Sequence, residues 1–373
     1  TKFTIPESLY SSFDEIVKHV KTLVDRTRFL KVGGNMEQLN KFIDSLQVRN
    51  MTALGPAMAT AYVIARERKV DRVVLLTDGL ANVGIGSFEG PQIPPASKYY
   101  ESLGEKFREA GTIVDVVGIA SGSGMELKTL GMMPLATGGE MYYITPSELD
   151  KSLAELSGTR VIGRDVEVRV IAPQGVVVRD VAGLPESVAR ELVSKGSAKL
   201  AAIGENQELY VAIEPSGELE ADEVPLQVQV VYTAPDGSRK MRAVTRRFKV
   251  ADSEKEVVSS MDPRVAAAFT VQKAGEDSFF GRSTEARKRL EAVREAIEAN
   301  APRAPAAAAP QFREAASALA SEIATLEEEL KCLHVAAAAP SAADAFSAAQ
   351  MQRMRRGAQE LFKRPKKDDD EDE

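Results

Sequence analysis

The chain has 373 residues, of which 44% are hydrophobic and 28% charged, and it carries a formal net charge of −7 at pH 7. This composition is ordinary for a globular protein of two or three domains, and the acidic excess argues against nucleic acid as a main partner. A single cysteine excludes a disulfide framework and a cysteine-rich zinc site, and two histidines leave little material for histidine-based metal chemistry.

Residues 1–160 alternate helical and strand patterns. Apolar residues recur at helical spacing in 13–24, 39–46, 55–68 and 96–110, and a further helix over 147–158 has Ser147 as its expected cap. Continuous apolar strands are predicted to end near Thr77, Ala120 and Ile144. Helices that alternate with such strands predict a parallel sheet covered on both faces, so we expect an α/β domain here.

Residues 161–252 change to a period of two. The runs "DVEVRVIA", "GVVVRDV" and "ELYVAIEP" alternate, and a longer alternating segment over 224–250 contains "APDGSR". The Pro-Asp-Gly sequence is a strong turn signal, which places a hairpin turn at Pro235–Ser238. We expect an antiparallel β-sandwich over these residues.

A helical region with Ala/Pro linkers is expected over 262–362. Two helices, Ser283–Asn300 and Phe312–Leu333, each carry an apolar stripe too narrow to be stable alone in water, so they are predicted to pair antiparallel. The side chains expected to face one another are Leu290, Val293 and Ile297 on the first helix and Leu319, Ile323, Leu326 and Leu330 on the second. The charged end, residues 363–373, is expected to be a solvated, disordered tail.

Two motifs occur together in the α/β part: "MTALGPAMATAYVIARE" at 51–67 and "VVLLTDGLANVG" at 73–84. With the order of elements around them, they resemble the von Willebrand factor A (VWA) family over residues 1–160. The following strands and helices are similar to the layout of cytosolic VWA proteins of eukaryotes and of COPII vesicle-coat proteins. The family holds a divalent metal at the top of the sheet with a D-x-S-x-S loop, a Thr and an Asp. The resemblance implies that Thr52 and Asp78 are metal ligands.

The D-x-S-x-S loop is absent from these 373 residues, and the similar "SGSGM" at 121–125 lacks the aspartate and is interpreted as a flexible loop. We therefore expect the α/β domain to be N-terminally incomplete, or another part of an assembly to fill its sheet. Oxygen ligands suit Mg²⁺, but two of them make a weak site. In the alternative interpretation Thr52 caps the helix that starts near Leu54, and Asp78 accepts amide hydrogen bonds from its own turn.

The expected function is that of a non-enzymatic interaction or scaffold protein that binds a partner through the top of the VWA-like domain. The resemblance implies that Mg²⁺ and an Asp or Glu of the partner make that contact. One alternative is a structural component of a cytoskeletal or coat assembly with an inactive metal site, and another is a metal-dependent enzyme. No apolar run approaches the roughly 20 residues of a membrane span, so the expected location is the cytoplasm, with cytoskeletal association as an option.

Overall fold

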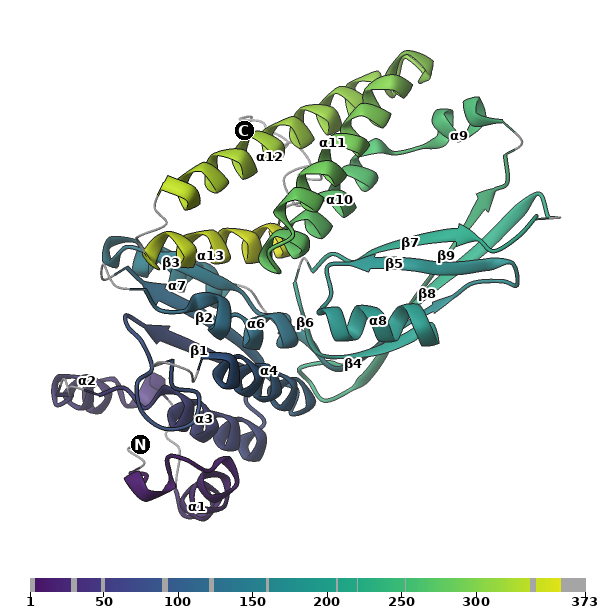
Figure 1. Ribbon diagram of the computed structural model, residues 1–373. Helices are drawn as coiled ribbons and strands as arrows, with labels where there is room; N and C mark the ends of the chain where they lie inside the picture. The colour runs from purple at the N-terminus through teal and green to yellow at the C-terminus, as the bar shows by residue number, and fades with distance from the viewer. Residues whose placement is uncertain are drawn as a thin grey trace, which may run out of the picture. The chain divides into compact units, whose positions relative to one another are not determined.

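The computed structural model describes residues 4–27, 32–47, 51–88, 93–120, 124–158, 161–205, 207–219, 221–251, 253–335 and 340–356. Figure 1 shows the chain from its N-terminal helices to its C-terminal helices. The chain divides into two compact units. Unit 1 comprises Thr1–Arg164, Leu200–Ala202 and Ala339–Asp344, and unit 2 comprises Asp165–Lys199, Ile203–Ala338 and Ala345–Glu373.

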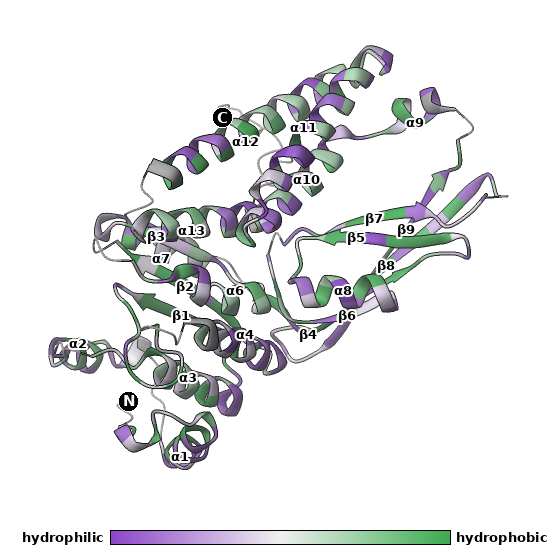
Figure 2. Ribbon diagram, viewed as in Figure 1, coloured by the Kyte–Doolittle hydropathy of each residue, from purple (hydrophilic) through white to green (hydrophobic). Residues whose placement is uncertain are grey.

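The sheet of unit 1 has three parallel strands in the order β1-β2-β3. They are β1 (Arg72–Thr77), β2 (Ile113–Ile119) and β3 (Met141–Ile144). The strands end where the apolar runs end in the sequence, so the predicted parallel sheet is confirmed. Hydrophobic colouring runs along β1 and β2 in Figure 2. Among the described strands, β1 pairs with β2 alone, and it is less buried than β2.

Helices precede and follow each of these strands. They are α1 (Phe13–Arg26), α2 (Met36–Asp44), α3 (Leu54–Arg68), α4 (Ile93–Glu109), α5 (Leu127–Leu130), α6 (Met132–Thr137) and α7 (Leu149–Gly158). Helix α1 packs on α3 because Ile16, Val20 and Val24 recur at helical spacing and bury one stripe. They meet Ala59 and Val63 of α3 in a continuous apolar cluster.

The start of α7 differs from the prediction that Ser147 is its cap. A 3₁₀ turn, Pro146–Glu148, precedes the helix, and Thr145 occupies the cap position in a reciprocal arrangement with Glu148. The Glu148 carboxylate accepts hydrogen bonds from the Thr145 backbone N–H and from its hydroxyl, both at 2.8 Å. Pro146 has a fixed φ that suits the first helical position, and it lacks the backbone N–H that would need an acceptor there. Both properties favour Thr145 as the cap residue.

Six strands between residues 161 and 249 form two sheets. A four-stranded sheet has the order β6-β4-β8-β9, and β5 pairs with β7 in a second sheet. The strands are β4 (Val161–Ile171), β5 (Val176–Ala182), β6 (Ser197–Gly204), β7 (Tyr210–Pro215), β8 (Glu223–Thr233) and β9 (Arg239–Lys249). The pairs β5–β7 and β8–β9 are antiparallel, in agreement with the period of two in the sequence.

The turn between β8 and β9 is confirmed where the sequence predicts it. The Ser238 carbonyl accepts from the Ala234 N–H at 2.9 Å, and the Asp236 carboxylate accepts from the Ser238 N–H at 2.9 Å. Gly237 has φ = 81°, which a residue with a side chain rarely adopts. One helix in this region was not predicted: α8 (Glu186–Lys195) lies between β5 and β6 and buries Leu192.

The C-terminal helices are α9 (Glu254–Ser260), α10 (Pro263–Phe279), α11 (Ser283–Asn300), α12 (Ala309–Val335) and α13 (Pro340–Arg356). The predicted pairing of α11 with α12 is confirmed, because Leu290, Ile297, Leu319 and Leu326 share one buried cluster. Helix α10 was not part of the predicted pair, but four of its residues belong to the same cluster: Ala267, Ala268, Val271 and Ala274. Helices α10, α11 and α12 therefore supply most of this core, and Val258 of α9 adds to it.

Two predicted features lie outside the described residues. They are the loop at 121–123 and the charged tail at 363–373. Within the described ranges, none of the helices combines the length and apolar character that a membrane crossing requires.

Candidate functional site

Asp78 follows directly after the last residue of β1, at the carboxyl edge of the parallel sheet. Thr77 is buried, and its hydroxyl donates to the Gly79 carbonyl at 3.1 Å, which turns the chain away from the strand. Asp78 itself is exposed. Because all three strands are parallel, the residues that follow β2 and β3 lie at the same edge, where ligands bind in open α/β sheets.

Thr52 is tied to the loop that follows Asp78. The Asn82 side-chain oxygen accepts from the Thr52 N–H at 2.7 Å, and the Asn82 N–H donates to the Thr52 carbonyl at 3.1 Å. Thr52 is exposed, and the N-cap of α3 is Ala53 rather than Thr52. The fold thus joins the segments of the two predicted ligands through Asn82, a residue that sequence reasoning noted only as part of the loop.

The loop over residues 84–86 is held rigidly against α3 and α4. A Cβ on Gly55 would lie 1.7 Å from the Ile85 carbonyl oxygen, so only glycine permits this approach. The Tyr99 hydroxyl donates to the Gly55 carbonyl at 2.8 Å, and the Tyr100 hydroxyl donates to the Gly86 carbonyl at 3.1 Å. Burial raises the pKa of both phenols, so both remain neutral donors at physiological pH.

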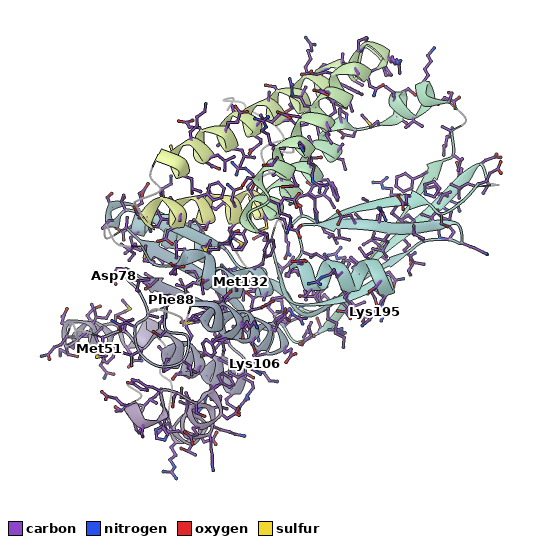
Figure 3. All side chains as sticks on the ribbon, in the orientation of Figure 1. Met51, Asp78, Phe88, Lys106, Met132 and Lys195 are labelled. Atoms are coloured by element: carbon purple, nitrogen blue, oxygen red, sulfur yellow. The ribbon has the colours of Figure 1, made fainter. Side chains whose placement is uncertain are left out.

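Large apolar side chains are exposed beside the polar residues of this edge. Met51, immediately before Thr52, is 65% exposed, and Leu80, two residues after Asp78, is 41% exposed. Figure 3 labels Met51, Asp78 and the buried Phe88 in this part of unit 1. The Phe88 N–H donates to the Ala81 carbonyl at 2.8 Å, which closes the loop between these two residues. The edge therefore presents a mixture of apolar and oxygen-bearing side chains on a fixed backbone.

The residues of this edge do not by themselves form a Mg²⁺ site. Thr52 and Asp78 offer two kinds of oxygen donor, whereas Mg²⁺ requires near-octahedral coordination. No group of three or more His, Cys, Asp or Glu side chains in the described ranges could hold a metal ion. A metal at this edge would need donors beyond those the described residues supply.

A buried carboxylate from the C-terminal part of the chain holds the segment that follows β2. Asp344 of α13 accepts from the Met125 N–H at 2.6 Å and from the Leu127 N–H at 2.7 Å. Leu127 begins α5, so the carboxylate satisfies amides that the helix cannot pair internally. No sequence signal pointed to Asp344, because it lies in an Ala/Ser-rich run more than 200 residues away from its partners.

Comparison with known proteins gives relatives of low identity. No protein-family model matches the chain. It is 27% identical over 263 residues to circularly permutated Ras protein 1 of Dictyostelium discoideum, covering 70% of this chain and 30% of that protein. It is 21% identical over 264 residues to protein transport protein SEC24 of Yarrowia lipolytica, covering 64% of this chain and 28% of that protein. The chain thus spans less than a third of the length of either relative.

A solved structure shares the fold over most of the chain. The human COPII-coat protein Sec24c superposes with a TM-score of 0.63 at 15% identity, covering 89% of this chain and 47% of that chain. At this identity the likeness concerns the fold alone. The predicted resemblance to the VWA family is confirmed at that level, together with the predicted combination of a parallel sheet, antiparallel sheets and C-terminal helices.

Proposed function

We propose that the chain is a non-enzymatic protein-binding scaffold of a transport or coat assembly, which contacts a partner through the carboxyl edge of its parallel sheet. The observation that carries this proposal is the fold shared with a COPII-coat protein over 89% of the chain. That range includes the α/β part, the antiparallel strands and the helices, so a whole architecture is shared rather than one motif. Curated relatives named for protein transport support the same function.

The chemistry of the edge supports a protein as the partner. Exposed Met51 and Leu80 lie in the same short segments as Thr52 and Asp78. Protein interfaces combine an apolar centre with a polar rim, and grouped apolar exposure marks binding surfaces. The hydrogen bonds between Asn82 and Thr52 fix this surface before binding, which lowers the entropic cost of association.

The metal-dependent form of this contact is a separate proposal. Thr52 and Asp78 would hold Mg²⁺ only together with donors that this sequence does not contain, and a carboxylate of the partner would then complete its coordination. With the residues of this chain alone, we expect binding to be independent of metal. The cytoplasmic location and the cytoskeletal association likewise remain predictions.

Replacing the apolar residues of the edge tests the proposal. The full chain would carry a photo-reactive amino acid at Lys98, an exposed residue of α4, to report covalent capture of partners in an extract of the source cells. The double variant Met51→Asp with Leu80→Asp should lose these cross-links. The matched control is Val257→Asp with Val265→Asp, which adds the same two charges at valines that are 50% and 46% exposed and should keep the cross-links. Equal cross-linking by all three proteins would contradict the proposal.

Chelation separates the two forms of the contact. If the contact is independent of metal, EDTA and Asp78→Ala should each change partner affinity by less than about twofold, since one exposed polar contact contributes little. A loss of binding on chelation that is reproduced by Asp78→Ala would instead support a Mg²⁺ site completed by outside donors. The two measurements together decide between these forms.

A further inference from the structure

Strand β9 forms a long, regular edge of the four-stranded sheet. Among the described strands it pairs with β8 alone, in continuous register from Glu223↔Lys249 to Thr233↔Arg239. All eleven of its residues are exposed. Alternate residues of an antiparallel edge strand direct their N–H and C=O groups away from the neighbouring strand. Such an edge is a template for a further strand unless something blocks it.

The charge of β9 is opposite to that of the chain. The whole chain carries −7, but β9 has six cations and no acid: Arg239, Lys240, Arg242, Arg246, Arg247 and Lys249. Two of these cations form ion pairs, Lys240 with Asp236 at 3.7 Å and Arg247 with Glu223 at 3.8 Å. Within the described part of the chain, Arg242 forms no ion pair. The strand therefore keeps a net positive charge after these ion pairs are counted.

Apolar side chains are interspersed among these cations. Met241, Val244 and Phe248 are 61%, 57% and 47% exposed. Phe248 also lines a cavity of about 250 Å³ at the end of β9, with Val176, Ile213, Leu219 and Val224 among its other walls. The cavity therefore offers an apolar position next to the cationic edge.

We infer that β9 binds an extended acidic segment of a partner protein as an added strand, with one apolar side chain of that segment in the Phe248 cavity. Main-chain hydrogen bonds supply affinity in this mode of recognition, and side-chain pockets supply specificity. Acidic residues of the segment would lie on the sheet face that carries Arg242 and Arg246, and its apolar residues would cover Met241 on the opposite face. This surface is distinct from the carboxyl edge proposed above.

Two other occupants fit less well. A second copy would place two strands with six cations each side by side, and like charges on facing strands are destabilising. The acidic end of this chain, residues 368–373, contains only Asp and Glu, which form strands poorly and cannot cover the apolar side chains. A partner segment that alternates acidic with β-branched or aromatic residues satisfies both requirements.

The probe for a binding test is a short synthetic peptide that alternates Glu with Val and carries one Phe, labelled for fluorescence anisotropy with the full chain. The same peptide N-methylated at every amide keeps its charges but has no backbone N–H to donate along either edge. We expect methylation to weaken binding about tenfold or more, because it removes the main-chain hydrogen bonds. Equal affinity of the two peptides would overturn the added-strand geometry.

Charge reversal on the strand completes the test. Arg242→Glu with Arg246→Glu should weaken binding of the unmodified peptide about tenfold or more. The matched control, Arg190→Glu with Lys195→Glu, makes the same change at exposed cations of α8 and should leave affinity within about twofold. Circular dichroism of each variant checks that the sheets remain folded. If both double variants weakened peptide binding equally, the overall charge of the chain would explain the effect, and the proposal would be overturned.

Further measurements address the other occupants. Dimerisation of the full chain that the peptide disrupts would assign the edge to a second copy. If the peptide bound only after residues 368–373 were replaced by Asn and Gln, the chain's own tail would be the occupant of the β9 edge. Binding to vesicles containing phosphatidylserine without binding to the peptide would assign it to an anionic surface. Each of these outcomes would overturn the proposal. The variant Met51→Asp with Leu80→Asp should leave peptide binding unchanged, so the two proposals fail independently.

Discussion

The residue most tightly constrained by its surroundings at the candidate edge is Gly55. Its missing side chain allows the Ile85 carbonyl to approach α3, and a Cβ there would force the backbone apart. We expect Gly55→Ala to lower the free energy of unfolding by about 3 kcal/mol. Gly79 is the matched control, because a Cβ on it would meet nothing within 4 Å and its φ is not positive. Gly79→Ala should stay within about 0.5 kcal/mol of the native chain in urea denaturation.

A second prediction at this scale concerns pH. Hydrogen bonds from the Arg264 side chain are the main reason that the pKa of Asp262 is below its ordinary value of 3.8. A carboxyl group with a lowered pKa stabilises the fold above its ordinary pKa, and this contribution is lost as the pH falls through the folded value. The stabilisation by Asp262 is therefore complete near neutrality and disappears below about pH 3.8.

The variant Asp262→Asn isolates this contribution. Asn keeps an oxygen that can accept from the Arg264 N–H at the start of α10 but removes the charge. Since the pair is partly exposed, the native chain should exceed the variant by no more than about 1 kcal/mol near pH 7. Urea denaturation at falling pH should show the two stabilities converge below pH 3.8. A difference that stays constant with pH would refute the assignment to the ion pair.

At the scale of elements, the core formed mainly by α10, α11 and α12 depends on side chains from each of these helices. Leu326 of α12 is 1% exposed, whereas Leu330, one turn later, is only partly buried. We expect Leu326→Ala to lower the free energy of unfolding by about 2–5 kcal/mol, because it removes contacts and leaves a cavity. Leu330→Ala should lower the free energy of unfolding clearly less in the same thermal or urea measurement. Equal costs would mean that α12 does not present Leu326 to the core.

At the scale of the whole molecule, helix α13 contributes to both units. Asp344, near its start, pairs with the Met125 and Leu127 amides of unit 1. Arg353, near its end, is buried in unit 2 and contacts Glu322 at 2.7 Å and Glu329 at 3.2 Å. Burial works against the charge of Arg353, but these two carboxylates raise its pKa, so it remains charged. One helix thus supplies a hydrogen-bonded side chain to each unit.

Hydrogen exchange can follow these two contributions separately. Asp344→Ala leaves two amides of unit 1 without their acceptor, which costs about 1–3 kcal/mol each when such groups are buried. The Met125 and Leu127 amides should therefore exchange faster in this variant. Arg353→Ala leaves two carboxylates of α12 without their cation and should speed exchange around Glu329. Unchanged protection at these amides would show that α13 does not stabilise them.

The sequence by itself determined the elements whose signals are local. The apolar runs that end at Thr77, Ala120 and Ile144 specify strands because a strand buried on both faces needs no polar alternation. The turn at Pro235–Ser238 follows from residues that favour one backbone conformation, and the stripes of α11 and α12 follow from a period that depends only on helix geometry. Thr52 and Asp78 were singled out through the resemblance of two short motifs to the VWA family, and their role as metal ligands stays a prediction.

Only the tertiary structure decided which distant segments meet. Helix α10 is buried on most of its surface and joins the helical core through small residues such as Ala267, Ala268 and Ala274, so its sequence shows no narrow stripe. The pairing of Asn82 with Thr52 and of Asp344 with Leu127 uses single polar side chains without a periodic pattern. The physical reason is that periodicity reports how an element faces its own core, whereas long-range hydrogen bonds depend on chain positions that only the folded backbone brings together.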